Sequence, residues 1–412
     1  MAYMPGPKNA DGTLAWLRRR NRQRVMEILR MHGQISQADI ARATGLSRTT
    51  VSTLVSELKE AGLVADIDTK SAHAHGGRPG VQLVLRNPSH VVVGIDFGHS
   101  HVAIAVADLA HNVLAERWYD LDVNREAARA LDVAADLFAE VLSEVSAERT
   151  SVLGVGMGIP GPVDRAHGTA GSATILPGWV GLRIAAEMEQ RLEIPVQIEN
   201  DANLGALAEL TWGAGRDCSN FAYIKAATGI GAGIVINGRL LRGATGTAGE
   251  IGHTTLDEAG PLCYCGNRGC LETVASGPAI VQLVGRVNGE TLTLSRIVEL
   301  ASGGDLRCRR ALADAGREIG VAVAGLCNLI NPERVIVGGL MSQSGEVLLA
   351  PLRESIRRHA VQAAAETVDV RAAVFVERAE LLGSVALALL GSDGGDPAQN
   401  RVAALSQAES RP

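Results

Sequence analysis

One imidazole and three thiols close together in the sequence could bind a metal ion. The four potential ligands fall within 18 residues: His253, Cys263, Cys265 and Cys270. Four nitrogen and sulfur ligands with no open position are typical of a closed structural zinc site. The alternative is a group of reduced thiols without metal, but Gly266 and Gly269 stand where a tight knuckle needs turns. The sequence therefore predicts a structural Zn²⁺ in a knuckle over residues 253–272.

Carboxylates and an amide near this motif could bind sugar hydroxyls. Asn200 and Asp201 follow an apolar strand and precede a helix, which places both at the sheet edge where ligands bind in α/β folds. Glu250 and Glu272 flank the metal motif. Zinc would also fix the tautomer of His253 and leave its second ring nitrogen to point into a cleft. Any one of these carboxylates could be a solvated surface residue, but together they suit vicinal hydroxyls, which donate and accept hydrogen bonds.

Glycine-rich turns after apolar strands could hold phosphate groups. The candidate residues lie in two of these turns: Asp96, Gly98 and Ser100, then Thr228, Gly229 and Gly231. A carboxylate can hold a metal-bound phosphate there and backbone amides can do the rest, although each turn alone also suits a hairpin. Further strand-to-glycine turns occur at 152–162 and 335–339. Four such turns among helices predict α/β layers in two nucleotide-fold halves, without a P-loop or Rossmann fingerprint.

The first 90 residues differ in charge from the remainder. They hold 13 of the 39 lysines and arginines against 7 of the 45 acidic residues, which leaves 26 basic and 38 acidic residues beyond them. A basic head on an acidic body suggests a nucleic-acid contact confined to the head. A solvated basic arm is the alternative that charge alone does not exclude.

Three short helices are expected in this head. The first covers 21–31, the second covers 37–44 behind an N-cap at Ser36, and the third carries an apolar stripe from Val51 to Leu58. The third helix and its cap present a polar face for DNA: Ser47, Arg48, Thr49, Thr50, Ser52 and Thr53. Hydroxyls can reach phosphates and arginine can pair with guanine, so the spacing predicts a helix-turn-helix that binds a double-stranded DNA operator.

A β-hairpin should follow as the wing of this unit. Strands are expected at 63–67 and 81–85, around a glycine-rich tip in which Arg78 suits the narrow minor groove. The alternative is a three-helix module used only for dimer contacts, which the basic excess disfavours. We expect Arg48→Ala and Arg78→Ala each to weaken operator binding without loss of the fold.

The order of motifs beyond residue 90 resembles the ROK family, which joins sugar kinases and sugar-responsive repressors. The motifs are DFGHS, GIPGPVD, VQIENDANLGALAE, ATGIGAGIVINGRLLRG, GEIGH, CYCGNRGCLE and NPERVIVGG. The winged helix-turn-helix ahead of them is similar to the repressor branch, which includes N-acetylglucosamine and xylose repressors, and the motif wording resembles actinobacterial members. The resemblance implies an α/β fold with a two-lobed actin-like (ribonuclease H-like) body.

The resemblance also implies roles for individual residues. It places zinc on the four ligands above, and a hexose on Asn200, Asp201, Glu250, His253 and Glu272. Asp201 matches the base of the kinases, which also need ATP and Mg²⁺. The chain departs from them at His99, Ser100 and His101, where kinases usually have a second glycine, then threonine and lysine or a similar residue, and at Ala227, commonly glycine in kinases.

These departures favour a transcriptional regulator that binds a sugar or sugar phosphate and is not an enzyme. One alternative is an active sugar kinase that uses ATP, Mg²⁺ and Asp201. The other is a ligand-independent DNA-binding protein in which zinc and cleft are purely structural.

Length and composition limit the remaining possibilities. The chain has 412 residues, 46% hydrophobic and 20% charged, enough for two or three globular domains. We expect a flexible segment at 1–17, a winged helix-turn-helix at 18–88, a kinase-like body at 89–390 and a flexible tail at 391–412. No apolar run suits a membrane span or a signal peptide, so a cytoplasmic protein without a membrane partner is expected. A homodimer or a dimer of dimers would supply paired DNA-binding heads.

Overall fold

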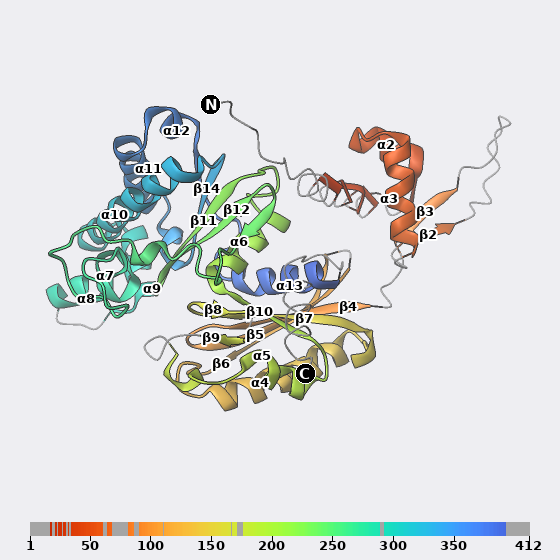
Figure 1. The fold of residues 1–412 in the computed structure, drawn as a ribbon, viewed down its shortest axis with the longest axis horizontal. Coiled ribbons are helices and arrows are strands. Elements are labelled where there is room, and N and C mark those ends of the chain that lie inside the picture. The colour runs from red at the N-terminus through yellow and green to blue at the C-terminus, as the bar shows by residue number, and fades with distance from the viewer. Residues whose placement is uncertain are drawn as a thin grey trace, which may run out of the picture.

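The fold is described from a computed structural model of the chain. The structure describes residues 34–60, 64–67, 81–85, 90–109, 111–165, 167–170, 176–288 and 292–392. Nearer the N-terminus it also describes residues 17–18, 21–22, 24–26, 28–29 and 32. Figure 1 shows a small head, formed by the N-terminal part of the chain, beside a larger body of two α/β lobes. The predicted fold class is confirmed.

The head has the predicted helices. The described residues between 17 and 32 are helical, and α2 (Gln37–Thr44) and α3 (Arg48–Glu60) follow. The Ser36 hydroxyl accepts a hydrogen bond from the backbone N–H of Asp39, 3.2 Å away, and so caps α2. Gly45 ends this helix in the left-handed conformation, with φ 70°. The apolar stripe of α3 packs into the head core with Val25 and Leu29, as the helical spacing predicts.

A three-stranded antiparallel sheet completes the head. Its strands are β1 (Gln34–Ser36), β2 (Val64–Ile67) and β3 (Gln82–Leu85), in the order β1-β3-β2. The β2–β3 pair is the predicted wing hairpin, and β1 is an additional strand. The wing tip with Arg78 lies outside the described residues, so its role stays a prediction.

Lobe one of the body is built on a five-stranded sheet in the order β10-β7-β4-β5-β6. Its elements are β4 (Val91–Phe97), β5 (His101–Asp108), β6 (Val113–Asp120), α4 (Ala127–Glu144), η1 (Arg149–Ser151), β7 (Val152–Ile159), β8 (Val163–Asp164), β9 (Thr169–Ala170), η2 (Pro177–Trp179), α5 (Ile184–Leu192) and β10 (Val196–Asn200). Alternate residues of β4 face opposite sides, since Val93 and Ile95 pack with α4, whereas Val92 packs with the C-terminal helix α13 (Ala379–Ser392). The sheet is therefore covered on both faces.

Lobe two has a second five-stranded sheet in the order β13-β12-β11-β14-β15. Its elements are α6 (Asp201–Thr211), β11 (Phe221–Ala226), β12 (Ile230–Ile236), β13 (Arg239–Leu241), η3 (Ile251–His253), α7 (Glu272–Ala275), α8 (Gly277–Asn288), α9 (Leu294–Ser302), α10 (Leu306–Ile330), β14 (Arg334–Gly338), η4 (Leu340–Ser344), α11 (Glu346–His359), α12 (Gln362–Thr367) and β15 (Asp369–Ala372). The long helix α10 packs on the outer face of this sheet with α11.

The two sheets have the same topology, which agrees with the prediction of α/β layers in two nucleotide-fold halves. In each sheet, three strands form an antiparallel meander and two further strands add in parallel on one side. Helices α6 and α13 pack together between the sheets, visible at the centre of Figure 1. Gly383 of α13 permits this approach, because a Cβ there would lie 2.1 Å from the carbonyl oxygen of Leu204 in α6.

Several boundaries differ from expectation. The turn predicted to hold Thr228, Gly229 and Gly231 is shorter than expected, because β12 begins at Ile230 and Gly231 therefore lies in a strand. The first two residues of the expected tail belong to α13, and residues 393–412 and 1–16 lie outside the described part of the chain.

Cys218, Cys308 and Cys327 are buried in the body. Among the described helices, none has the length and apolar character that crossing a membrane requires.

Candidate functional site

A cavity of about 1320 Å³ is lined by residues of both lobes. Five lining residues are the sugar-site candidates: Asn200, Asp201, Glu250, His253 and Glu272. Six more are the phosphate-site candidates: Asp96, Gly98, Ser100, Thr228, Gly229 and Gly231. Residues that were predicted as separate sites along the chain therefore line one cleft.

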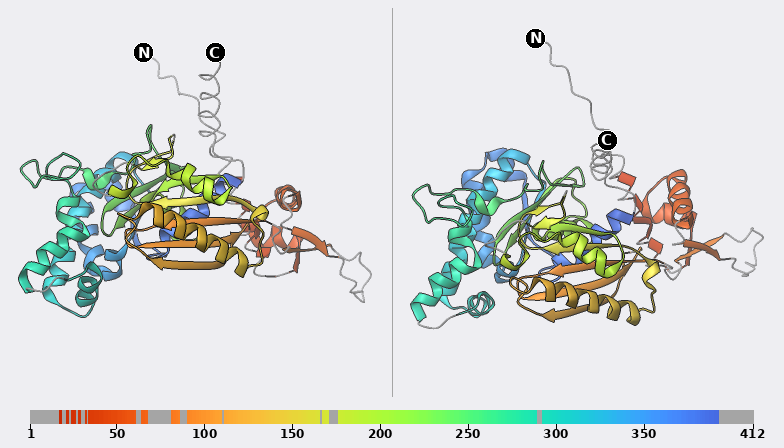
Figure 2. Two further views of the ribbon diagram at one scale, coloured as in Figure 1. Left: turned by 90° about the horizontal axis from the view of Figure 1, so that it is seen from below. Right: turned by 60° about the horizontal axis from the view of Figure 1, so that its bottom comes forward.

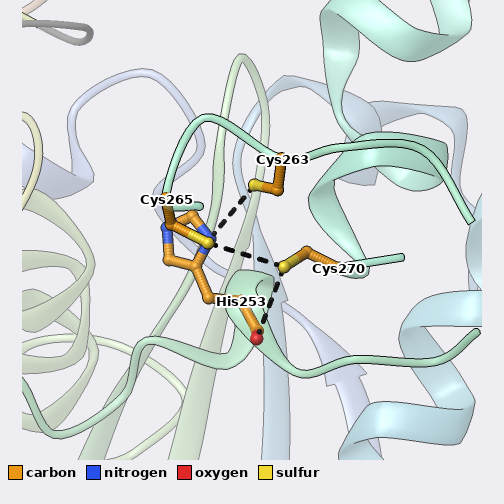
Figure 3. Close-up of side chains that lie close together, drawn as sticks. All are labelled: His253, Cys263, Cys265 and Cys270. Atoms are coloured by element: carbon orange, nitrogen blue, oxygen red, sulfur yellow. Dashed lines mark hydrogen bonds between the residues drawn. The ribbon is translucent and has the colours of Figure 1, made fainter. Parts of the chain in front are cut away.

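The four predicted metal ligands come together beside this cleft (Figure 3). Their ligand atoms all lie within 4.8 Å of one another. Cys265 Sγ is 3.7 Å from Cys270 Sγ, and Cys263 Sγ is 3.6 Å from His253 Nδ1. A tetrahedral zinc with Zn–S bonds of about 2.3 Å separates its sulfur ligands by about 3.7 Å, so this donor set fits zinc without rearrangement. The ion would tie the loop from Pro261 to Cys270 to η3, and its role would be structural.

The second nitrogen of His253 faces the cleft, as the tautomer argument predicts. Its Nε2 is 3.2 Å from the Tyr264 hydroxyl and 4.0 Å from Glu272 Oε2. Nδ1 is directed at the metal ligands, so only Nε2 can contact a bound molecule. Tyr264 was not a predicted site residue. Its position between two of the candidate metal-ligating cysteines is the signal that could have indicated it.

Asn200 and Asp201 lie at the junction of β10 and α6, at the carboxyl end of the strand. The Asn200 side-chain oxygen accepts hydrogen bonds from the N–H groups of Ala202 (2.9 Å) and Asn203 (3.2 Å), and its amide donates to the Gly161 carbonyl (2.9 Å). Asn200 therefore caps α6 and holds the loop after β7. One of its N–H groups is left for a ligand.

Asp201 is held by a lysine that sequence reasoning missed. Lys225 Nζ donates to Asp201 Oδ2 at 2.9 Å and to Glu380 Oε1 at 2.7 Å. Burial alone would lower the pKa of Lys225, but attraction from Asp201 and Glu380 outweighs burial and raises that pKa well above its usual value. The lysine thus stays charged and fixes Asp201 between β11 and α13. A lone lysine within the apolar strand β11 is the signal in the sequence.

Glu250 and Glu272 offer acceptors to the cleft. Burial, followed by the nearby charges of Asp201 and Glu272, raises the pKa of Glu250 to about 7. Glu272 Oε1 accepts a hydrogen bond from the Ile230 N–H at 3.1 Å, whereas its buried Oε2 has no hydrogen-bond partner among the described residues. A buried acceptor without a donor is costly, so this atom suits a ligand hydroxyl.

The phosphate-binding half is altered around Asp96. Its Oδ2 is 3.1 Å from His101 Nε2, and the His101 ring lies over the backbone of Gly98. A Cβ at Gly98 would lie only 2.2 Å from His101 Cε1. The imidazole therefore covers the backbone that phosphate oxygens would approach and takes up the carboxylate that would bind a metal. His99 is held beside it, with Nδ1 2.7 Å from Asn124 Oδ1. These residues do not fit magnesium-bound ATP as they are arranged.

The second candidate phosphate loop is also partly used by the protein. The Ala227 N–H donates to the Gly229 carbonyl at 3.1 Å and closes the turn, while the Ile230 N–H is bonded to Glu272. Thr228 is exposed at the tip of this turn. Two of the amides that could face a phosphate thus have partners inside the chain.

The predicted DNA-contacting face of α3 is on the surface of the head. Ser47, Arg48, Thr49, Ser52 and Thr53 are exposed, and Thr50 is half-buried. The Ser47 hydroxyl caps the helix by accepting from the Thr50 N–H at 3.1 Å and lies 2.8 Å from the Thr50 hydroxyl. Cap formation occupies these two hydroxyls, so Arg48, Thr49 and Ser52 are the more available contacts.

Comparison with known proteins assigns both parts of the chain. The sequence model of the ROK family matches residues 92–390. The chain belongs to the ROK family. A winged helix-turn-helix DNA-binding model matches residues 18–65, so the ROK body follows a DNA-binding head.

Similar proteins include both regulators and kinases of the ROK family. The xylose repressor of Caldicellulosiruptor bescii is 31% identical over 92% of this chain and 97% of its own length. A crystal structure of a ROK family transcriptional regulator, a homologue of the Escherichia coli Mlc protein, superposes with a TM-score of 0.71 at 28% identity, covering 92% of this chain and 98% of that one. A ROK family glucokinase from Streptomyces griseus, solved with glucose and AMPPNP, gives a TM-score of 0.64 at 30% identity, covering 72% and 98%.

Proposed function

We propose that this ROK protein is a sugar-responsive transcriptional repressor of carbohydrate-utilisation genes. Its head would bind a double-stranded operator through α3 and the wing. Its cleft would bind a sugar effector that shifts the protein between two states of different DNA affinity.

One observation carries this proposal: the two halves of the cleft differ in their readiness for ligands. In the sugar half, Glu250, Glu272 and His253 present polar atoms to the cavity. In the phosphate half, His101 covers Gly98 and pairs with Asp96. This cleft can hold a sugar, but its phosphate half is not open to a nucleotide. A sugar-responsive regulator needs only the sugar, whereas a kinase needs the nucleotide as well.

The arrangement of the head supports the same proposal. Arg48 projects from the first turn of α3, where a recognition helix contacts base edges. Residues 1–90 carry the excess of basic residues. Operators read by such heads contain two half-sites, so a homodimer, or a dimer of dimers, is part of the proposal.

The test uses the full-length, zinc-loaded chain. Duplexes selected from a random DNA pool would be tested in band shifts at fixed salt, with and without millimolar xylose, glucose or N-acetylglucosamine. We expect selection of a two-part, pseudo-palindromic sequence and a change in its affinity of at least about 5-fold with one of the sugars. Selection of no sequence, or an affinity that no sugar alters, would contradict the proposal.

A second candidate function is sugar phosphorylation, favoured by the carboxylate of Asp201 in the cleft. Such a kinase would need Asp201 to take the proton of the attacking hydroxyl. A coupled ATP assay over hexoses, pentoses and amino sugars, with Asp201→Asn as the control, separates the two functions. We expect no turnover above the Asp201→Asn background. Turnover that this substitution abolishes would establish the kinase.

A further inference from the structure

The charges that line the cleft indicate which class of effector it binds. This inference rests on the proposed function. Seven carboxylates line the cavity, and its permanent cations among the described residues are Lys225 and Arg378. Three of the carboxylates are the sugar-site groups Asp201, Glu250 and Glu272. This excess of negative charge opposes the entry of an anion and leaves an uncharged polyol unaffected.

Neither permanent cation is available to a phosphate. Lys225 donates to Asp201 and Glu380, at 2.9 and 2.7 Å. Arg378 Nη2 contacts Glu116 Oε2 at 2.5 Å. Each cation is thus neutralised by a carboxylate of the protein, so a dianionic group would have to displace a carboxylate to reach it.

His99 and His101 offer no better phosphate site. His101 is paired with Asp96, and His99 is directed at the side-chain oxygen of Asn124. A phosphate beside His101 would therefore lie beside the buried carboxylate of Asp96 as well. Like charges at such a distance repel strongly away from bulk water.

Several backbone N–H groups that could face a phosphate are also bonded within the chain. The N–H groups of Ala202 and Asn203, at the start of α6, donate to Asn200, and the Ala202 N–H is also 2.8 Å from Asp201 Oδ1. The Ile230 N–H, at the glycine turn, donates to Glu272. A helix start or a glycine loop attracts phosphate through unpaired N–H groups, and side chains of this chain already accept hydrogen bonds from these three.

What the cleft does offer is hydrogen-bond acceptors in need of donors. Among the described residues, Glu272 Oε2 is buried without a hydrogen-bond partner, and Glu250 lines the same cavity. Each sugar hydroxyl supplies one donor, whereas a phosphate dianion supplies none. We propose that the effector is an unphosphorylated sugar, which the cleft binds through its hydroxyl groups and distinguishes from the corresponding sugar phosphate by repulsion.

Titration calorimetry on the full-length, zinc-loaded protein tests this with three matched pairs. The pairs are xylose and xylose 5-phosphate, glucose and glucose 6-phosphate, and N-acetylglucosamine and N-acetylglucosamine 6-phosphate. We expect at least one neutral sugar to bind and its phosphate to bind about 100-fold more weakly. A phosphate that binds as tightly as, or more tightly than, its neutral partner overturns the inference and leaves a sugar-phosphate-responsive repressor standing. Absence of binding in all three pairs overturns the inference together with the proposed sugar response.

A variant pair examines the cause of the discrimination. Glu380→Gln removes one of the two carboxylates that bind Lys225. The ratio of the dissociation constants of the sugar phosphate and the neutral sugar should therefore shrink by about 10-fold. Glu377→Gln is the matched control, because it removes a carboxylate of the same cavity whose hydrogen-bond partner is the uncharged Gln343, at 3.2 Å. We expect the control to change this ratio of dissociation constants by less than about 2-fold. Equal effects of the two substitutions would contradict the role of Lys225 neutralisation. Should Glu380→Gln fail to fold, the wild-type pairs decide the inference.

Discussion

The carboxyl of Glu250 is poised to make stability depend on pH. Burial and the charges of Asp201 and Glu272 raise its pKa from 4.5 to about 7. The native state therefore binds this proton more tightly than the unfolded state does. Protonation of Glu250 thus stabilises the fold fully below pH 4.5, and this stabilisation is lost as the pH rises through 7. We expect Glu250→Gln to be more stable than the wild type by about 1–3 kcal/mol at pH 8.

Thermal melts between pH 5 and pH 8 check this expectation. The advantage of Glu250→Gln should shrink as the pH is lowered, because the wild-type carboxyl then takes up its proton. Glu377→Gln, at the exposed rim of the same cavity, serves as the control. A Glu250→Gln advantage that is the same at every pH would exclude titration of this group as its source.

The zinc assignment gives a prediction with a clear stoichiometry. We expect the purified protein to carry one zinc per chain by elemental analysis, and Cys270→Ala to carry less than about a tenth of that. Cys308→Ala is the matched control, since Cys308 is an equally buried thiol outside the cluster. Full zinc content in the Cys270→Ala variant would remove the proposed metal centre.

At the scale of residues, the sequence predicts what lies close together in the chain. The knuckle from His253 to Cys270 is local, so spacing alone predicts it. The pairs of Lys225 with Glu380, and of Arg378 with Glu116, join residues far apart in the sequence and depend on how α13 packs between the sheets. No spacing rule indicates such partners, and they determine the charge of the cleft.

Among the helices, α3 carries the prediction on DNA recognition. Arg48 is exposed in its first turn, and the apolar stripe is buried on the other side. We expect Arg48→Ala to weaken operator binding by about 1–3 kcal/mol, as expected for loss of an arginine contact to a base edge, without a change in thermal stability. Arg357→Ala, an exposed arginine of α11 in the body, is the control in the same band shift. Equal affinities of the two variants would contradict recognition by α3.

Close packing of α13 on α6 gives a prediction on stability. Gly383→Ala would place a Cβ 2.1 Å from the Leu204 carbonyl, a backbone atom that cannot move aside without displacing α6. We expect a loss of about 2 kcal/mol or more in urea unfolding. Gly154→Ala is the control, because a Cβ there meets no atom within 4 Å. Similar stability of the two variants would show that the helices can separate at little cost.

At the scale of elements, local signals account for the correct predictions and tertiary packing for the errors. Caps and apolar spacing define α2 and α3 in the sequence itself. The three residues of β1 are too few to show a periodicity, and their pairing with β3 joins distant segments. The start of β12 reads as a turn because glycine is unfavourable in strands, yet Gly233 is required there, since a Cβ would lie 2.5 Å from the Ala202 carbonyl in α6.

In the whole molecule, the head lies beside lobe one, away from α8–α10 of lobe two (Figures 1 and 2). Leu109, directly after β5, packs against the hydrophobic core of the head and also against the cluster formed by α13. Helix α13 contains Glu380, which holds Lys225 and thereby Asp201 in the cleft. A continuous set of contacts thus joins the cleft to the DNA-binding head through one helix and one side chain.

This arrangement predicts that Leu109 contributes to the coupling between sugar and DNA. Leu109→Ala should reduce the effect of saturating sugar on operator affinity by at least about 3-fold, because the head would no longer pack tightly on the α13 cluster. Sugar affinity measured without DNA should stay within about 2-fold of the wild type, since Leu109 does not line the cleft. Leu114→Ala, an exposed leucine of β6, is the control for loss of the same side chain elsewhere in lobe one. Coupling of wild-type size in Leu109→Ala would show that the signal crosses to the head by another route, whereas a loss of sugar affinity would place the effect in the cleft itself.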